Sequence, residues 1–174
     1  MRLAGLKLND CIDGEGISVS LWTQGCPHRC KGCHNPETWD FNGGYEDETN
    51  NIRGQIVKAL SANNTQRNFS VLGGEPLCEQ NKEDVLTILT CVRMAYPHIK
   101  IFLWTGYTYE KLIDKNDITI NNILSKVDVL IDGPFIQEKR DLSLWLRGSL
   151  NQRVIDLKYM RNNNIILPYI IDKN

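Results

Sequence analysis

Apolar residues recur along this chain in short runs of strand length, separated by segments with helical periodicity. The strand-length runs span residues 3–8, 17–22, 68–72, 99–104, 127–131, 153–157 and 165–169. Helical spacing over residues 52–60 and 85–96 predicts two helices, and Thr108 fits the N-cap of a third, short one. The middle strands begin about 30 residues apart, a rhythm typical of βαβ units and a mostly parallel sheet.

The length of the chain limits how far such a sheet can curl. Successive βαβ units wind in a right-handed sense. A closed eight-stranded barrel takes roughly 200 residues or more, whereas this chain has 174. We therefore expect an α/β fold, an incomplete parallel (β/α) barrel that is open along one side. We expect residues 1–174 to form a single domain.

Residues suited to chemistry follow the ends of several predicted strands. These segments are a cysteine-rich stretch after residue 22, Gly73-Gly74-Glu75-Pro76, Thr105-Gly106-Tyr107 and Asp132. In parallel α/β folds the active site lies at the carboxyl ends of the strands, so we expect these segments to meet. The Asp13-Gly14-Glu15-Gly16 turn between the first two strands fits either a simple hairpin or a contact with substrate.

Three cysteines, Cys26, Cys30 and Cys33, form a C-x3-C-x2-C pattern. Three thiolates can hold three irons of a [4Fe–4S] cluster, which normally takes four cysteines, and this leaves one iron open to an outside ligand. Structural zinc, with His28 or His34 as fourth ligand, is the alternative, although zinc sites usually pair two ligand knuckles. Disulfides are disfavoured because we expect no signal peptide and because cysteines this close pair poorly.

The composition and charge of the chain argue against several classes of function. Apolar residues make up 41% of the chain and charged residues 24%, as in ordinary soluble proteins. The formal net charge of -1 gives no support for a nucleic-acid partner or a polybasic membrane surface. No apolar run approaches the roughly 20 residues of a membrane span. With Cys11, Cys78 and Cys91 expected to be free thiols, we expect a cytoplasmic protein.

These motifs together resemble the radical S-adenosylmethionine superfamily. Within its glycyl-radical activase branch, the sequence is most similar to the activating enzymes of anaerobic ribonucleoside-triphosphate reductases. The segments that carry the resemblance are 22–26, 32–35, 38–39, 104–107, 129–135 and 147–152. They follow the family's order and cover nearly the whole chain.

The resemblance implies a reaction, a cofactor and two partners. A reduced [4Fe–4S] cluster would cleave S-adenosylmethionine to methionine and a 5′-deoxyadenosyl radical, which takes hydrogen from a glycine Cα in the large component of the reductase. A low-potential electron donor such as flavodoxin would reduce the cluster. An activase of another glycyl-radical enzyme, such as pyruvate formate-lyase, is an alternative. A small iron–sulfur electron-transfer protein and a zinc-binding module are alternatives from other classes.

The resemblance also assigns residues to the cluster and to S-adenosylmethionine. Cys26, Cys30 and Cys33 match the cluster ligands. Gly32, Cys33 and His34 match the backbone stretch along the bound cofactor, and His34 is the candidate for contact with the adenine. Gly73, Gly74 and Glu75 match the turn that receives the methionine amino group, where glycine permits close backbone approach.

Four further polar residues have two interpretations each. Asp132 fits a contact with the cofactor or a cation, or a cap on the next turn. Arg147, Asn151 and Gln152 fit contacts with the partner or with the cofactor carboxylate, or positions in a solvated loop.

Overall fold

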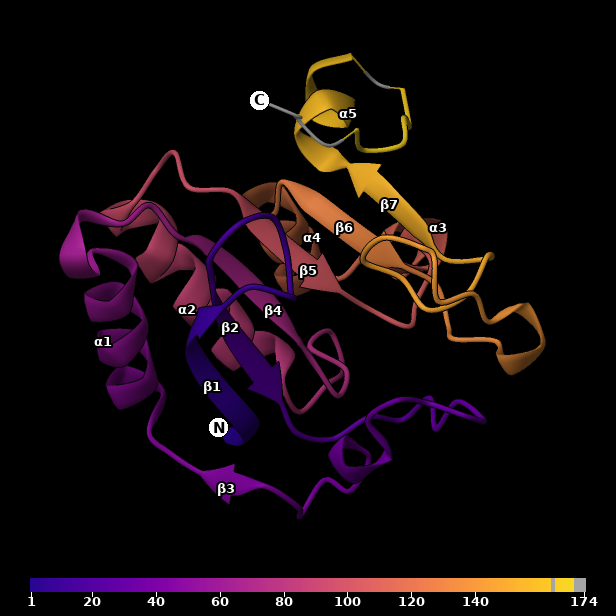
Figure 1. Ribbon diagram of the computed structural model, residues 1–174, viewed down its shortest axis with the longest axis horizontal. Helices are drawn as coiled ribbons and strands as arrows, with labels where there is room; N and C mark the ends of the chain where they lie inside the picture. The colour runs from indigo at the N-terminus through magenta and orange to yellow at the C-terminus, as the bar shows by residue number, and fades with distance from the viewer. Residues whose placement is uncertain (164, 171–174) are drawn as a thin grey trace.

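Seven strands form one open, mixed sheet in the computed structural model, which describes residues 1–163 and 165–170 (Figure 1). The strands are β1 (Arg2–Asp10), β2 (Ser18–Thr23), β3 (Tyr45–Glu46), β4 (Asn68–Gly73), β5 (Ile101–Trp104), β6 (Val129–Asp132) and β7 (Arg153–Asp156). Their order across the sheet is β3-β1-β2-β4-β5-β6-β7. The α/β class and the open sheet predicted from the sequence are confirmed.

The prediction of a mostly parallel sheet holds only for its centre. Strands β2, β4, β5 and β6 pair in parallel, whereas β1, β3 and β7 add at the edges in antiparallel fashion. The central strands are linked by crossovers that contain helices, as parallel neighbours require. Strands β1 and β7 are joined to their antiparallel neighbours β2 and β6 without a crossover α-helix, as antiparallel pairing allows.

In the described part of the chain, five α-helices accompany the sheet. They are α1 (Thr49–Leu60), α2 (Lys82–Ala95), α3 (Tyr109–Asp114), α4 (Ile118–Lys126) and α5 (Leu157–Asn163), and short 3-10 turns span Pro36–Thr38, Ala62–Asn64 and Gln137–Lys139. Helices α1, α2 and α4 supply apolar side chains such as Ile56, Ile88 and Ile123 to the main core. Helix α3 begins after Thr108, whose side chain accepts a hydrogen bond from the Lys111 N–H, as predicted.

The two faces of the sheet differ because side chains alternate along each strand. Val19 and Leu21 of β2 are fully buried in the main core with the helices. Ser18, Ser20 and Trp22 point to the other face, where Ser20 lies beside Ser70 of β4.

That second face carries a smaller apolar cluster around Phe102 and is partly covered by the segment 11–17. The Ser70 hydroxyl donates to the Asp13 carbonyl, and the Asn68 side-chain amide donates to the Glu15 carbonyl at 2.6 Å. The Asp13–Gly16 turn is therefore a loop folded over the sheet rather than a tight hairpin.

The predicted strand at 165–169 is wrong. The segment forms one isolated bridge, between Ile155 and Pro168, and no ladder. Pro168 has no N–H to donate, and Ile165 and Ile166 are exposed rather than packed on the sheet. An apolar run alone did not distinguish this loop from a strand.

Within the described residues, no helix is long and apolar enough to span a lipid bilayer.

The N-terminus of α4 gives a stability prediction. The Asp117 carboxylate accepts hydrogen bonds from the Thr119 and Ile120 N–H groups at 2.9 and 3.1 Å and from the Lys82 ammonium at 2.6 Å. These bonds, with that from Lys82 the largest cause, lower the pKa of Asp117. We expect Asp117→Ala to reduce the free energy of unfolding at pH 7 by about 1 kcal/mol, with Asp117→Asn, which keeps the cap, losing less.

The sign of the pH dependence follows from the lowered pKa. The contribution of Asp117 is present above its unfolded pKa of about 4 and is lost as the pH falls through the folded value. Urea unfolding from pH 7 to pH 2.5 should therefore show wild type and Asp117→Ala converging in acid. A difference that stays constant over this range would contradict the assignment.

Candidate active site at the carboxyl edge of the sheet

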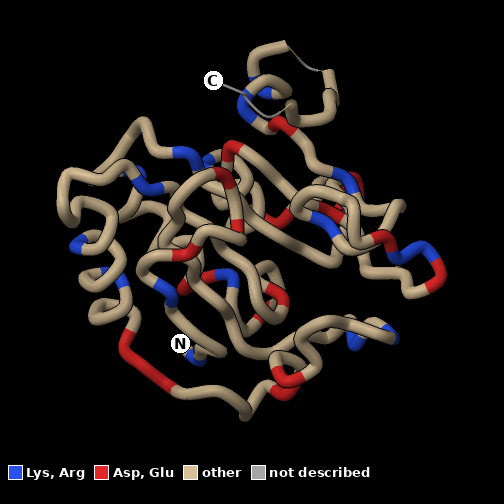
Figure 2. The backbone as a smooth tube through the Cα atoms, in the orientation of Figure 1, with Lys and Arg blue, Asp and Glu red and all other residues tan. Residues whose placement is uncertain are grey.

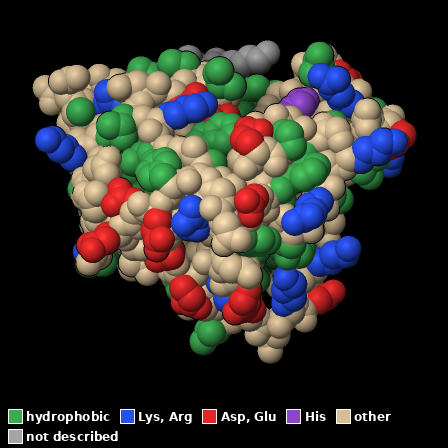
Figure 3. Space-filling view, turned by 90° about the horizontal axis from the view of Figure 1, so that it is seen from below, with side chains coloured by type: hydrophobic (Ala, Val, Ile, Leu, Met, Phe, Trp, Pro, Cys, Tyr) green, Lys and Arg blue, Asp and Glu red, His purple; other side chains and the backbone are tan. Residues whose placement is uncertain are grey.

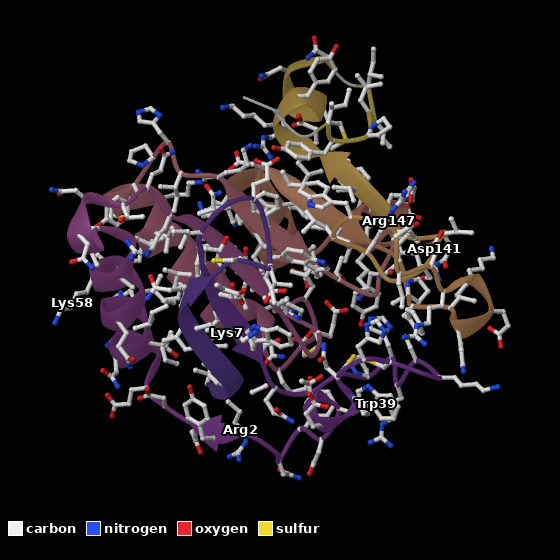
Figure 4. The ribbon with its side chains drawn as sticks, viewed as in Figure 1. Arg2, Lys7, Trp39, Lys58, Asp141 and Arg147 are labelled. Carbon is white, nitrogen blue, oxygen red and sulfur yellow. The ribbon has the colours of Figure 1, made fainter. Side chains whose placement is uncertain are left out.

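A cavity of about 130 Å³ lies where β2, β4, β5 and β6 end. Its lining includes Cys26, Cys30 and Cys33, the Gly73-Gly74-Glu75 turn, and His28, Thr38, Trp39, Trp104, Thr105, Gly106, Gly133, Phe135 and Gln152. Trp39 and Arg147, labelled in Figure 4, come from the two segments that flank it. The structure thus brings the cysteines and the glycine turn together, as expected from their positions at strand ends.

Backbone hydrogen bonds and two left-handed residues shape the cysteine loop (residues 26–33). The Gly25 and Cys26 N–H groups donate to the carbonyls of Thr38 and Trp39 at 2.8 and 3.2 Å. Arg29 has φ 46° and Gly32 has φ 75°, and the Cys33 N–H donates to the Cys30 carbonyl at 3.0 Å, so the loop turns tightly between its second and third cysteines. This winding turns all three partly exposed thiols toward the cavity.

The thiols lie in surroundings that disfavour the free thiolate. Burial raises the pKa of Cys26 to about 11; the backbone N–H of His28 opposes this shift and the charge of Glu75 adds to it. Burial also raises the pKa of Cys30. Cys33 accepts a hydrogen bond from the Asn35 N–H at 3.4 Å. Binding a metal here must therefore displace protons from Cys26 and Cys30.

The arrangement suits a cluster better than a single ion. In the described chain, no three His, Cys, Asp or Glu side chains gather closely enough to hold one metal ion. His28 Nε2 is instead hydrogen-bonded to Glu75, and the ring of His34 packs 5.6 Å from that of Phe135. The cysteines of a [4Fe–4S] cluster bind different irons, so thiols spread around a cavity fit that group.

The glycines of the turn after β4 are required by the packing of the backbone. A Cβ on Gly73, which has φ 99°, would lie 2.7 Å from the Thr23 nitrogen, and a Cβ on Gly74 would lie 2.4 Å from the Gly25 carbonyl oxygen. The Glu75 N–H also donates to that Gly25 carbonyl at 2.9 Å. The two glycines thus allow the turn to pack against the segment that precedes Cys26, and both also line the cavity.

The carboxylate of Glu75 is fully buried and fully partnered. It accepts hydrogen bonds from the Leu77 N–H at 3.0 Å, the Thr105 hydroxyl at 2.8 Å, the Gly106 N–H at 2.8 Å and His28 Nε2 at 2.7 Å. These donors come from the ends of β4 and β5 and from the cysteine loop, so one side chain joins three segments of the site.

Asp132 is fully buried at the end of β6 and does not line the cavity. Its carboxylate accepts hydrogen bonds from the Tyr109 N–H at 2.7 Å and from Arg153 Nε at 2.9 Å. Arg153 also pairs with Glu110, and both carboxylates raise the pKa of its guanidinium. Of its two interpretations, the geometry favours a cap, here at the start of α3.

The segment between β6 and β7 is held by its own polar side chains. Arg147 donates to the Gln152 carbonyl at 2.6 Å, and Asn151 donates to the Pro134 carbonyl at 2.8 Å. Gln152 donates to the Gly133 carbonyl at 3.1 Å and lines the cavity, unlike Arg147 and Asn151. Gly32 also lies against this segment, because a Cβ there would be 3.0 Å from the Gln137 side chain.

Sequence reasoning missed the contact of His28 with Glu75 and the aromatic lining by Phe135. Their partners lie far away in the chain, and no local spacing signals such contacts. The thiol of Cys78 is buried and that of Cys91 is partly buried.

Because Gly74 packs against Gly25, a substitution at Gly74 should affect the cysteine loop as well as the turn itself. Gly74→Ala should displace Gly25 and with it Cys26, and so lower both the free energy of unfolding and the iron bound after anaerobic reconstitution. Gly54→Ala in α1 is the matched control, because a Cβ there meets nothing within 4 Å. Equal iron content in the two variants would refute this role of Gly74.

Comparison with known proteins agrees with this site. The family model described as a 4Fe-4S single cluster domain matches residues 12–155. An anaerobic ribonucleoside-triphosphate reductase-activating protein from Haemophilus influenzae is 40% identical over 146 residues, which are 82% of this chain and 90% of the relative. Proteins of the same name from Vibrio cholerae and Escherichia coli are 38% and 35% identical, over 82% and 86% of this chain and 90% and 94% of their own lengths. The chain therefore belongs to the family of anaerobic ribonucleoside-triphosphate reductase-activating proteins.

Proposed function

We propose that this protein activates an anaerobic ribonucleoside-triphosphate reductase by forming a glycyl radical on its large component. The observation that carries the proposal is the convergence of Cys26, Cys30 and Cys33 with the Gly73–Glu75 turn on one cavity. The names of the relatives, which match over most of their length, support the same role.

Cys26, Cys30 and Cys33 are the proposed cluster ligands. A [4Fe–4S] cluster bound there would supply the electron for reductive cleavage of S-adenosylmethionine to methionine and a 5′-deoxyadenosyl radical. The protein contributes position, shelter from water and the hydrogen bonds at sulfur that tune the cluster's potential. Such a bond reaches Cys33 from the Asn35 N–H.

The proposed contacts with S-adenosylmethionine come mainly from backbone groups. They are those of Gly32, Cys33 and His34 on one side of the site and of Gly73, Gly74 and Glu75 on the other. Because the carboxylates of Glu75 and Asp132 already have protein partners, we assign the side chains of both residues to support of the site.

We further propose that the sheet acts as an incomplete barrel of the radical S-adenosylmethionine type, within a single domain of residues 1–174. Its open side would admit the loop of the reductase that carries the glycine, and that loop would help to exclude water from the radical. Six free cysteines are compatible with work in the reducing cytoplasm.

A low-potential, acidic electron carrier such as flavodoxin is the proposed donor. Four exposed cations lie on the two segments that flank the cavity, Arg29 and Lys31 on the cysteine loop and Lys139 and Arg140 between β6 and β7. Figure 2 shows Lys and Arg on both segments, with Asp and Glu beside them on the second. None of the four forms a salt bridge in the described structure. Figure 3 shows several Lys and Arg side chains on the right side of the molecule, with Asp and Glu among them and further cations elsewhere on this face. Such a rim attracts an acidic partner most strongly at low salt.

The donor proposal predicts a selective effect of charge reversal. Lys31→Glu and Lys139→Glu should slow cluster reduction by the flavodoxin several-fold at low ionic strength, with the difference shrinking in about 0.5 M salt. Lys58→Glu on α1, an exposed cation far from the cavity, is the control (Figure 4). Equal slowing by all three variants would assign the effect to net charge rather than to this rim.

The cluster proposal is tested by single substitutions. Cys26→Ala, Cys30→Ala and Cys33→Ala should each abolish assembly of a [4Fe–4S] cluster and cleavage of S-adenosylmethionine. Cys78→Ala and Cys91→Ala should leave iron and sulfide content near that of the wild type. Reconstituted protein that holds zinc, without iron and sulfide, would overturn the proposal.

The activity itself is tested by assaying the partner. Reduced, reconstituted protein with S-adenosylmethionine should turn the inactive reductase from the same organism into an enzyme that reduces ribonucleoside triphosphates. Activation of a different glycyl-radical enzyme, with no effect on the reductase, would move the assignment to another activase.

A further inference from the structure

The ring of His28 is inserted between the cysteine loop and the end of β5. Its side chain is only 18% exposed, and its Nε2 lies 2.7 Å from Glu75 Oε2. The ring meets Tyr107 edge-on, with 4.5 Å between centroids. A Cβ on Gly106 would lie 2.4 Å from the ring, so only glycine at this position leaves room for it.

Glu75, the partner of His28 in this contact, is held in place by other hydrogen bonds. The Glu75 carboxylate also binds the Thr105 hydroxyl and the N–H groups of Leu77 and Gly106. A fully buried charge is tolerated only when its hydrogen-bonding capacity is filled. Because a carboxylate cannot donate, Nε2 of His28 carries the hydrogen of this bond. His28 therefore holds the cysteine loop to a fixed anchor.

The anchor also lies close to the sulfurs. His28 is two residues from both Cys26 and Cys30, and these three side chains line the same cavity as that of Glu75. No Lys or Arg is paired with Glu75 in the described structure, so its charge is offset by neutral donors and by His28. A carboxylate at this place opposes the addition of an electron to a neighbouring cluster.

We propose that Glu75 and His28 are positioning residues for the cluster: their bond fixes the cysteine loop, and the buried carboxylate lowers the reduction potential. The inference rests on the proposed cluster ligands, but it assigns to these two residues a role separate from binding S-adenosylmethionine. It also explains why Gly106, which lines the cavity, has no side chain.

The positioning part is tested in the full-length chain before reconstitution. Amide hydrogen exchange over residues 28–33, followed by mass spectrometry, should be about tenfold faster in His28→Ala, because the bond to a charged carboxylate is lost. His28→Gln, which keeps an N–H donor, should restore slow exchange. Gly106→Ala should resemble His28→Ala, and Gly54→Ala should not. Wild-type exchange in His28→Ala would overturn the proposal.

The electrostatic part is tested on the reconstituted cluster. Glu75→Gln should shift the one-electron reduction equilibrium by about tenfold toward the reduced form, which corresponds to about 59 mV. Glu79→Gln, the same change at an exposed carboxylate paired with Lys82, is the control. An unchanged potential in Glu75→Gln would overturn this part.

Two safeguards keep the tests separate. If Glu75→Gln loses its helical circular dichroism and does not fold, His28→Ala and His28→Gln decide the proposal. Their reduction potentials are then compared as well as their hydrogen exchange. If the reconstituted protein fails to cleave S-adenosylmethionine, the proposed function fails, whereas exchange and potential still report on Glu75 and His28.

Discussion

The buried carboxylate of Glu75 is the contact on which the geometry of the site depends. It follows β4, binds the Thr105 hydroxyl and the Gly106 N–H after β5, and holds His28 of the cysteine loop. Removing any one donor would leave a buried charge undersatisfied, which costs more than the loss of an exposed hydrogen bond. The three segments are therefore coupled, and the cysteine loop takes its shape from the strands beneath it.

Close backbone packing provides the second constraint on the same region. Gly73 and Gly74 lie against Thr23 and Gly25, so the end of β4 touches the chain just before Cys26. A parallel pair such as β2 and β4 brings both strand ends to one edge. The positions of Cys26 and Glu75 are thus fixed by one strand pairing. The same pairing brings together His28 and Glu75, which are 47 positions apart in the sequence.

The sequence predicted those parts of the fold that local periodicity controls. Strands β2, β4, β5 and β6 and helices α1 and α2 carry clear apolar patterns, and they were predicted close to their observed bounds. Helix α4 was not predicted, because Ile118–Lys126 contains β-branched residues and two asparagines, which are poor helix formers. Its formation depends on the Asp117 cap and on packing against α2, and neither can be read from periodicity. Local sequence patterns are limited in the same way at the site. The cysteines can be recognised by their spacing, whereas the role of His28 depends on Glu75, which lies far away in the sequence.

The central claim is that this protein places a radical on a glycine of the reductase. Its most direct test is electron paramagnetic resonance of the anaerobic reductase after incubation with the reduced, reconstituted protein and S-adenosylmethionine. We expect a glycyl-radical doublet that requires Cys26, Cys30 and Cys33 and disappears when the reductase's C-terminal glycine is replaced by alanine. Cleavage of S-adenosylmethionine without any such doublet, or a doublet that survives the glycine substitution, would contradict it.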